Sequence, residues 1–210
     1  MIKVLIADDH AVVRRGLRQI LTDESDMLVG GEAASAPEVR ALVRDQRFDV
    51  IVLDINMPGG SGMDLLAELR RDHPEARVLV LTVYPEDQYA VRAIKAGAAG
   101  FLTKESAPEK LIEAVRKIAS GGRYVSPELA EALASLLAGE TSGPPHERLS
   151  DREFEVFRSL ASGKTVSQIA LELGLSVKTV STHRTRILKK MEMRNNAELT
   201  HYAVKNRLVE

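Results

Sequence analysis

Apolar and polar positions follow two alternating periods along the first 138 residues. Short apolar runs predict strands at residues 2–8, 27–31, 49–54, 78–82 and 100–103. Between the strands, apolar residues recur at helical spacing and predict helices at residues 11–21, 37–46, 62–71, 87–96, 108–121 and 127–138. Strands that alternate with helices in this way predict an α/β domain with a doubly wound, five-stranded parallel sheet.

The pattern changes after residue 138. Residues 139–147 are polar and contain two glycines and adjacent prolines, which predicts a linker. Residues 150–153, Ser-Asp-Arg-Glu, have the sequence of a capping box that opens a helix. Further helical segments follow at 166–173, 177–191 and 197–206, without a strand signal. We therefore expect an α/β domain at 1–122, an extra helix and linker at 123–147, and a small all-α domain of four helices at 148–210.

Composition narrows the class of protein. The chain is 44% hydrophobic and 28% charged, which is typical of globular proteins, and it has no cysteine. Disulfide bonds and thiolate chemistry are thereby excluded. The apolar run near the N-terminus ends at Asp8 and Asp9, too early for a signal peptide or a membrane span. We expect a cytoplasmic protein that has no membrane partner.

Charge is distributed unevenly between the two expected domains. Residues 1–144 contain 17 Lys and Arg against 22 Asp and Glu, whereas residues 145–210 contain 12 against 8. A basic surface is typical of a protein with a polyanionic partner. The C-terminal part is therefore the candidate for nucleic-acid binding.

Polar residues stand where the predicted strands end. Asp8 and Asp9 end the first strand, Asp54 the third and Thr82 the fourth, and Lys104 follows the fifth. In an open parallel sheet, ligands bind beyond these ends, and the acids converge if strands one, three and four are neighbours. Crowded carboxylates raise one another's pKa, and a hard cation such as Mg²⁺ relieves this. Each residue alone is explained as a turn residue or a helix cap; the combination predicts a metal site.

One of these aspartates could also act as a nucleophile. An aspartate carboxylate can accept a phosphoryl group as an aspartyl phosphate. The transferred group needs positive charge and hydrogen-bond donors around its oxygens. Mg²⁺, the ammonium group of Lys104 and the hydroxyl of Thr82 would supply both to a group on Asp54.

The segments IKVLIADDH, VIVLDINMPGGSGMDLL, VLVLT and AGAAGFLTK resemble the receiver domain of two-component response regulators. The resemblance implies a flavodoxin-like sheet of strand order 2-1-3-4-5. It also implies these roles: Asp54 as phosphoacceptor, Asp9 as a direct Mg²⁺ ligand, Asp8 as an acid acting largely through water, the backbone carbonyl of Asn56 as a further ligand, Thr82 and Phe101 as the switch pair, and Lys104 as the phosphate-binding lysine. Val83 and Tyr84 depart from the commonest family pattern.

The segment Gly174–Met191 contains five Lys and Arg and no acid. Together with the helix before it, this segment predicts a helix-turn-helix whose second helix enters the DNA major groove. On a helical wheel, one face is apolar and consists of Val177, Val180, Ile187, Leu188 and Met191. Residues expected to contact DNA are Lys178, Thr179, Ser181, Thr182, Thr185 and Lys189. The alternative is a solvated charged helix, but such a face usually mixes both signs.

Two other residues of this segment lie near the apolar side of the wheel. We expect Arg184 to pair with another helix or to reach a phosphate around the edge. We expect His183 to be a packed structural residue. Neither is therefore a candidate for reading bases.

Residues 149–208 are similar to LuxR-type DNA-binding domains, and the whole chain is identified as a member of the NarL/FixJ subfamily of response regulators. The resemblance implies a sensor histidine kinase as phosphodonor, double-stranded DNA as target and a homodimer that binds paired half-sites. It also implies a dimer contact on the last helix, with Leu199, Tyr202 and Ala203 as candidates. The expected activity is that of a stoichiometric phosphoacceptor, without enzymatic turnover.

Two other functions fit part of the pattern. A phosphatase or phosphotransferase that uses Asp54 as turnover nucleophile would often carry a general acid–base two residues later, but that residue is Asn56. A DNA-binding protein that acts independently of phosphate would need no intact set of carboxylates, threonine and lysine. Both hypotheses are weaker than a phosphorylation-controlled transcription factor.

Overall fold

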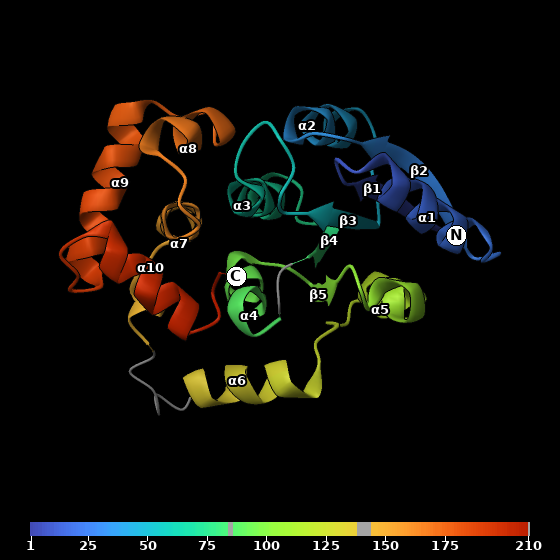
Figure 1. Ribbon diagram of the computed structural model, residues 1–210. Helices are drawn as coiled ribbons and strands as arrows, with labels where there is room; N and C mark the ends of the chain where they lie inside the picture. The colour runs from blue at the N-terminus through green and yellow to red at the C-terminus, as the bar shows by residue number, and fades with distance from the viewer. Residues whose placement is uncertain (84–85, 138–143, 210) are drawn as a thin grey trace. The chain divides into compact units, whose positions relative to one another are not determined.

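The computed structural model describes residues 1–83, 86–137 and 144–209 (Figure 1). The chain forms two compact units, Met1–Leu137 and Ala138–Glu210. Strands of the first unit are β1 (Ile2–Ala7), β2 (Met27–Ala33), β3 (Val50–Asp54), β4 (Arg77–Thr82) and β5 (Gly100–Thr103). Its helices are α1 (Ala11–Thr22), α2 (Ala36–Asp45), α3 (Gly62–Asp72), α4 (Glu86–Ala96), α5 (Ala107–Ala119) and α6 (Pro127–Leu137). Each predicted strand and helix of this unit is present.

The five strands form one parallel sheet of order β2-β1-β3-β4-β5, which confirms the predicted topology. The chain moves outward from β1 to β2 and then returns past β1 to continue with β3. The carboxyl ends of β1 and β3 are therefore neighbours at the point where the strand order reverses, the usual place of a ligand site in such a sheet.

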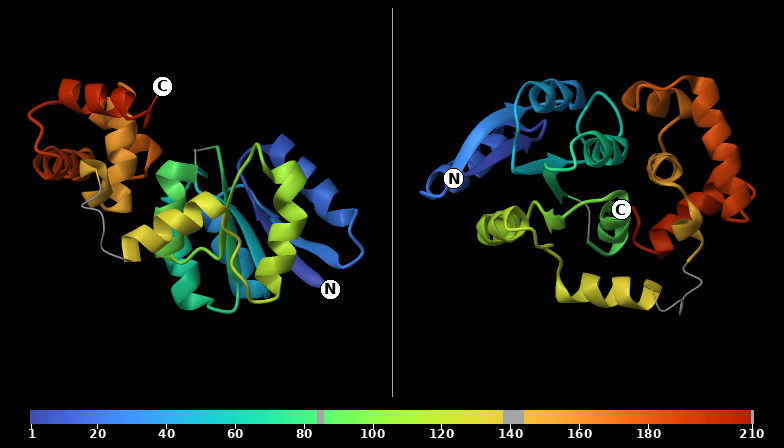
Figure 2. Two further views of the ribbon diagram at one scale, coloured as in Figure 1. Left: turned by 90° about the horizontal axis from the view of Figure 1, so that it is seen from below. Right: turned by 180° about the vertical axis from the view of Figure 1, so that it is seen from behind.

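Helices cover both faces of the sheet (Figures 1 and 2). On one face, alternate strand residues such as Ile6, Val52 and Leu81 pack with Leu21 of α1 and Val115 of α5. The helices α2, α3 and α4 lie on the other face (Figure 1). Because both faces are covered, central strands are apolar throughout, and all five positions of β3 are buried.

The helix α6 belongs to the first unit. The chain before it pairs with β5, where Gly100 bridges to Tyr124 and the Phe101 N–H donates to the Tyr124 carbonyl at 3.2 Å. The helix itself contacts α4 and buries Leu129.

The second unit contains the 3₁₀ helix η1 (Pro145–Arg148) and the helices α7 (Asp151–Ala161), α8 (Val166–Glu172), α9 (Val177–Lys190) and α10 (Asn196–Lys205). No strand occurs among residues 144–209, as predicted. The capping box at Ser150 and Glu153 is confirmed. Phe154 and Phe157 of α7 are fully buried and form the centre of this bundle. No helix in the described ranges is long and apolar enough to cross a membrane.

The end of the predicted linker is helical. Residues 145–148 form η1, and the ring of His146 stacks on Phe154 with centroids 5.9 Å apart. The same ring lies 2.8 Å from the Tyr202 hydroxyl through Nδ1. Aromatic contacts with α7 and α10 thus order this end of the segment.

Candidate functional site

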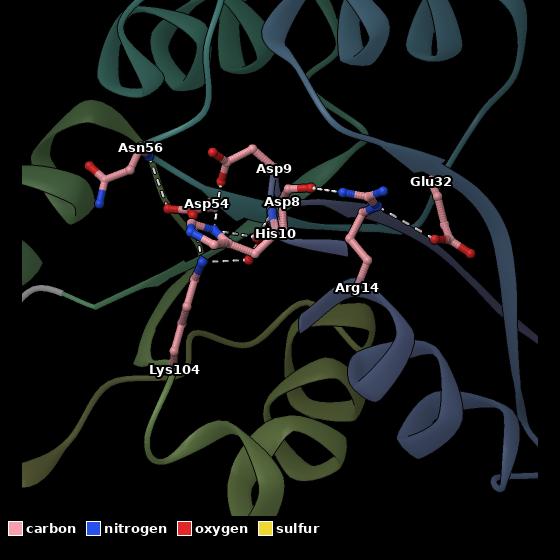
Figure 3. Close-up of polar contacts among 8 residues, drawn as sticks. All are labelled: Asp8, Asp9, His10, Arg14, Glu32, Asp54, Asn56 and Lys104. Atoms are coloured by element: carbon pink, nitrogen blue, oxygen red, sulfur yellow. Dashed lines mark hydrogen bonds and ion pairs between the residues drawn. The ribbon is translucent and has the colours of Figure 1, made fainter. Parts of the chain in front are cut away.

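The carboxyl ends of β1 and β3 bring the predicted acidic residues together (Figure 3). One ligand atom each from Asp8, Asp9, His10 and Asp54 lies within 4.8 Å of the others. Asp8 and Asp54 are almost completely buried, whereas the side chain of Asp9 is 32% exposed. Two carboxylates are thus removed from water, and one lies at the rim.

Lys104 joins the two buried acids. Its Nζ atom lies 2.6 Å from Oδ2 of Asp54 and 2.6 Å from Oδ2 of Asp8. The lysine follows β5, and its backbone N–H donates to the Thr82 carbonyl at 2.8 Å, which links the ends of β4 and β5. Buried charges need such a partner because desolvation alone costs several kcal/mol for each ion.

Burial dominates the titration of Asp54. Desolvation raises the pKa of this carboxyl, although a hydrogen bond from Lys104 and the Asn56 backbone N–H at 2.9 Å both lower it. For Lys104, desolvation lowers the pKa, but Asp54 and Asp8 outweigh it and the net pKa is raised. The pKa values of both partners are therefore raised. Desolvation outweighs the ion pair for Asp54, which is almost completely buried, whereas the ion pairs outweigh desolvation for Lys104.

The other predicted residues surround this cluster. The side chain of Asn56 is exposed, and its contact with Asp54 is made by the backbone. Thr82 is fully buried at the end of β4, one residue beyond Leu81, which pairs with Asp54. Phe101 is 2% exposed within β5. Val83 is 64% exposed beside Thr82, and Tyr84 lies outside the described residues.

Two contacts at the acids were absent from the sequence-based set (Figure 3). His10 lies with Nδ1 2.7 Å from Asp9 Oδ1, and its backbone N–H donates to Asp8 Oδ1 at 2.8 Å. Arg14 donates from Nη1 to the backbone carbonyl of Asp8 at 2.6 Å. The position of His10 directly after two aspartates was a usable signal, whereas the contact of Arg14 depends on how α1 leaves the sheet.

The donor set fits Mg²⁺. All three acids offer carboxylate oxygens, the hard ligands that Mg²⁺ prefers. Oδ2 of Asp8 is buried and, among the described residues, has no hydrogen-bond partner of good geometry, although Lys104 lies at ion-pair distance. A buried carboxylate oxygen that lacks a well-aligned hydrogen bond, next to two more acids, is a suitable ligand for a cation.

Most of the residues predicted to contact DNA lie on the surface of α9. Lys178, Ser181, Thr182, Thr185 and Lys189 are exposed. Thr179 is only partly exposed, and its hydroxyl lies 2.8 Å from that of the N-cap residue Ser176. The structure therefore places Thr179 in the cap of α9.

The wheel was wrong at one apolar position and incomplete at one basic position. Val177 is 51% exposed, because the helix contacts the core only from Val180 onward. Arg186 was missed, although it is exposed and the wheel places it beside Thr182. The helical periodicity of 100° per residue was therefore sufficient to include Arg186 among the residues predicted to contact DNA.

Arg184 and His183 face the body of the second unit. Arg184 donates from Nε to the side-chain oxygen of Asn196 at 2.7 Å, so it contacts another helix, as expected, but through an amide. His183 is half-buried, and its Nδ1 has no hydrogen-bond partner among the described residues.

Two of the three candidates for a dimer contact are unsuitable. Leu199 and Ala203 are fully buried inside their own unit, because α10 packs against α7. Exposed residues of α10 include Val204 and Lys205.

Comparison with known proteins accounts for both units. Residues 4–116 match the response regulator receiver domain, and residues 147–203 match the luxR family of bacterial regulatory proteins. The chain belongs to the response-regulator family. It is 35% identical over 209 residues to the response regulator UvrY of Escherichia coli (strain K12), covering 99% of this chain and 96% of that protein. It is 36% identical over 211 residues to the response regulator GacA of Pseudomonas aeruginosa, covering 100% and 99%.

Solved structures agree with this assignment. RcsB of Salmonella enterica serovar Typhimurium, bound to promoter P1flhDC in the presence of the phosphomimetic BeF3⁻, is 29% identical with a TM-score of 0.71, covering 96% of this chain and 97% of that one. Another RcsB structure, of Salmonella typhimurium, has a TM-score of 0.74 at 27% identity and covers 97% of each chain. The chain is thus a response regulator of the NarL/FixJ subfamily, with a receiver domain and a LuxR-type DNA-binding domain that regulates transcription.

Proposed function

We propose that this response regulator accepts one phosphoryl group on Asp54 and that the modification controls binding to double-stranded DNA. Mg²⁺ would be held by Asp8, Asp9, Asp54 and the backbone carbonyl of Asn56. The observation that carries the proposal is the position of Lys104, whose Nζ lies 2.6 Å from both buried carboxylates. One site thus contains a nucleophile, metal-ligating acids and a cation for a phosphoryl oxygen.

The phosphodonor is a phosphohistidine of a sensor histidine kinase. An oxygen of Asp54 forms a bond to phosphorus while the P–N bond breaks, and the imidazole leaves with the bonding electron pair. Bound Mg²⁺ supplies positive charge that stabilises the phosphoryl oxygens in the transition state. Lys104 keeps its proton, because its pKa is raised, and exchanges its contact with Asp54 for a phosphoryl oxygen.

Phosphorylation adds about −1.5 to −2 charges at Asp54. The hydroxyl of Thr82 turns to donate to a phosphoryl oxygen, and Phe101 repacks into the space that this movement opens. Since Phe101 has no hydroxyl, packing alone drives its movement. The resulting change in the receiver surface controls dimerisation. A local change in charge thus shifts an interface between two states.

The DNA-binding face is the exposed side of α9. Lys178 and Lys189, together with Arg186, meet phosphates, while Ser181, Thr182 and Thr185 are small enough to approach base edges. Thr179 supports this face from the helix cap. A homodimer places two such helices on paired half-sites. We place the functional boundaries at 1–122 for the receiver, 123–147 for the extra helix and linker, and 148–210 for DNA binding.

The first test is labelling of the full-length protein by acetyl phosphate and Mg²⁺, followed by intact mass spectrometry. We expect a single phosphoryl adduct on the wild type and none on Asp54→Ala. Asp64→Ala removes an exposed carboxylate from the next helix and should leave the adduct unchanged. Labelling of Asp54→Ala at the wild-type level would refute the assignment, and release of phosphate over many turnovers would indicate a phosphatase.

The second test is binding to DNA fragments selected in vitro, with and without BeF3⁻ and Mg²⁺. We expect BeF3⁻ to strengthen binding of the wild type and to have no effect on Asp54→Ala. Equal affinity of the wild type in both conditions would support a DNA-binding protein that acts independently of phosphate.

A further inference from the structure

We propose that Arg14 is a positioning residue for the metal-binding acids. By binding the backbone carbonyl of Asp8, it holds the peptide unit between Asp8 and Asp9 in the orientation that Mg²⁺ binding requires. This inference rests on the proposed function of the site and adds a residue that lies outside the ligand set.

The contact is short and charge-assisted. Arg14 lies in the first turns of α1, and its Nη1 donates to the Asp8 carbonyl at 2.6 Å (Figure 3). Hydrogen bonds from a charged donor are about twice as strong as neutral ones. The Asp8 N–H donates to the carbonyl of Ala33 at 3.0 Å, so the residue is held by β2 on one side and by Arg14 on the other.

Glu32 on β2 braces the guanidinium. One carboxylate oxygen of Glu32 lies 3.7 Å from Nε of Arg14, and the other lies 3.2 Å from Nη1 of Arg18. Only 19% of the Arg14 side chain is exposed, compared with 55% of Arg18. Arg14 is therefore confined between the acidic loop and the strand, whereas Arg18 lies at the surface.

The peptide bond transmits this constraint to the metal ligands. The Asp8 carbonyl and the Asp9 N–H belong to one planar group, so fixing the carbonyl also fixes the direction in which Asp9 leaves the strand. Mg²⁺ accepts only near-octahedral geometry, with ligands at about 2.0–2.1 Å. A small rotation of this peptide unit would therefore weaken binding.

A positioning role and a purely electrostatic role predict effects of opposite sign. Arg14 carries a positive charge near a cation site, so its charge alone repels Mg²⁺, and its removal would tighten binding. Loss of a positioning contact weakens binding instead. Arg14→Met therefore separates the two roles, whereas Glu32→Gln does not, because loss of its negative charge and loss of the brace both weaken binding.

The experiment is titration of full-length protein with Mg²⁺ by isothermal calorimetry, with thermal unfolding measured in the absence of metal. We expect Arg14→Met to raise the Kd for Mg²⁺ about tenfold, the lower end of the effect of residues that orient metal ligands. Arg14→Lys should restore part of the affinity. Arg18→Met is the matched control. Like Arg14→Met, it removes one positive charge and one ion pair with Glu32, but within the described residues Arg18 makes no hydrogen bond to Asp8.

The outcomes separate the alternatives. An unchanged or lower Kd in Arg14→Met would overturn the positioning role, as would an equal loss of affinity in Arg18→Met. If Arg14→Met does not fold, Arg14→Lys decides, because it keeps the positive charge. A weaker Mg²⁺ affinity of Arg14→Lys at unchanged metal-free stability supports the proposal, and an unchanged affinity in both Arg14→Lys and Glu32→Gln overturns it. Absence of Mg²⁺ binding in the wild type would instead refute the proposed function, and with it any metal role of Arg14.

Discussion

At the scale of single residues, the stability of the receiver site depends on Lys104. Asp8 and Asp54 are almost completely buried, and Lys104 lies at 2.6 Å from both. Like charges at such distances repel strongly in a medium less polar than water. A single ammonium group therefore makes two buried carboxylates tolerable in the metal-free receiver.

We predict that Lys104→Met lowers the free energy of unfolding of the metal-free receiver by about 3 kcal/mol, because removing one partner leaves buried charges uncompensated. Saturating Mg²⁺ should recover part of this loss. Urea denaturation with and without Mg²⁺ measures both effects. Lys110→Met removes an exposed lysine of α5 and is the control. Equal stability of the two variants without metal would show that Lys104 does not carry the compensation.

At the scale of elements, α9 serves two functions that divide its surface. Val180 and Ile187 are fully buried against the bundle, while the basic and small residues face outward. His183 lies between these faces, and within the described part of the chain its buried Nδ1 has no hydrogen-bond partner. Burial lowers the pKa of this imidazole, Glu153 opposes the effect, and Arg152 and Arg186 reinforce it.

A lowered pKa makes the stability of the second unit dependent on pH. Below the ordinary value of 6.5, the unfolded chain binds a proton at His183 more readily than the folded unit does. Stability present above pH 6.5 should therefore be lost as the pH falls through the lower folded-state pKa, with a slope of at most about 1.4 kcal/mol per pH unit.

The measurement is urea unfolding between about pH 5 and 8, followed by ¹⁹F NMR of fluorotyrosine at Tyr202, the only tyrosine of the second unit. His183→Gln should flatten the dependence, whereas His201→Gln, at an exposed position of α10, should retain it. A wild-type slope that His183→Gln leaves intact would assign the effect to another group.

At the scale of the whole molecule, ligand chemistry is divided between two units. The receiver part is acidic and contains the carboxylate cluster, and the C-terminal part is basic and contains the candidate DNA-binding helix α9. Each unit has its own apolar core. Metal binding should consequently stabilise one unit directly and leave the other unchanged in the unphosphorylated protein.

Mg²⁺ at 100 times its Kd should stabilise the receiver by about 2.7 kcal/mol, and EDTA should reverse the effect. Hydrogen exchange of the full-length protein checks this unit by unit. Amides of β1 and β3 should gain protection, while amides of α7 and α9 should not. Equal protection of both units by Mg²⁺ would contradict an independent metal site in the receiver.

The amino-acid sequence alone predicted the secondary structure and the sheet topology of this protein. Strand and helix positions follow from local periodicity, and the parallel sheet follows from their alternation. Asp8, Asp54 and Lys104 could be placed at one edge because each directly ends or follows a strand. The LuxR-type domain was recognisable because residues 149–208 resemble that family.

Contacts between distant segments were decided only by tertiary structure. The bridge of Lys104 between two acids, the bond from Arg14 to a backbone carbonyl and the burial of Leu199 and Ala203 all depend on how separate elements pack. Periodicity assigns a residue to a face but does not show where along a helix that face meets the core, which is why Val177 was misplaced. Local sequence specifies which groups arrive at the site, and long-range packing specifies which atoms touch, because side-chain reach and desolvation depend on neighbours remote in the chain.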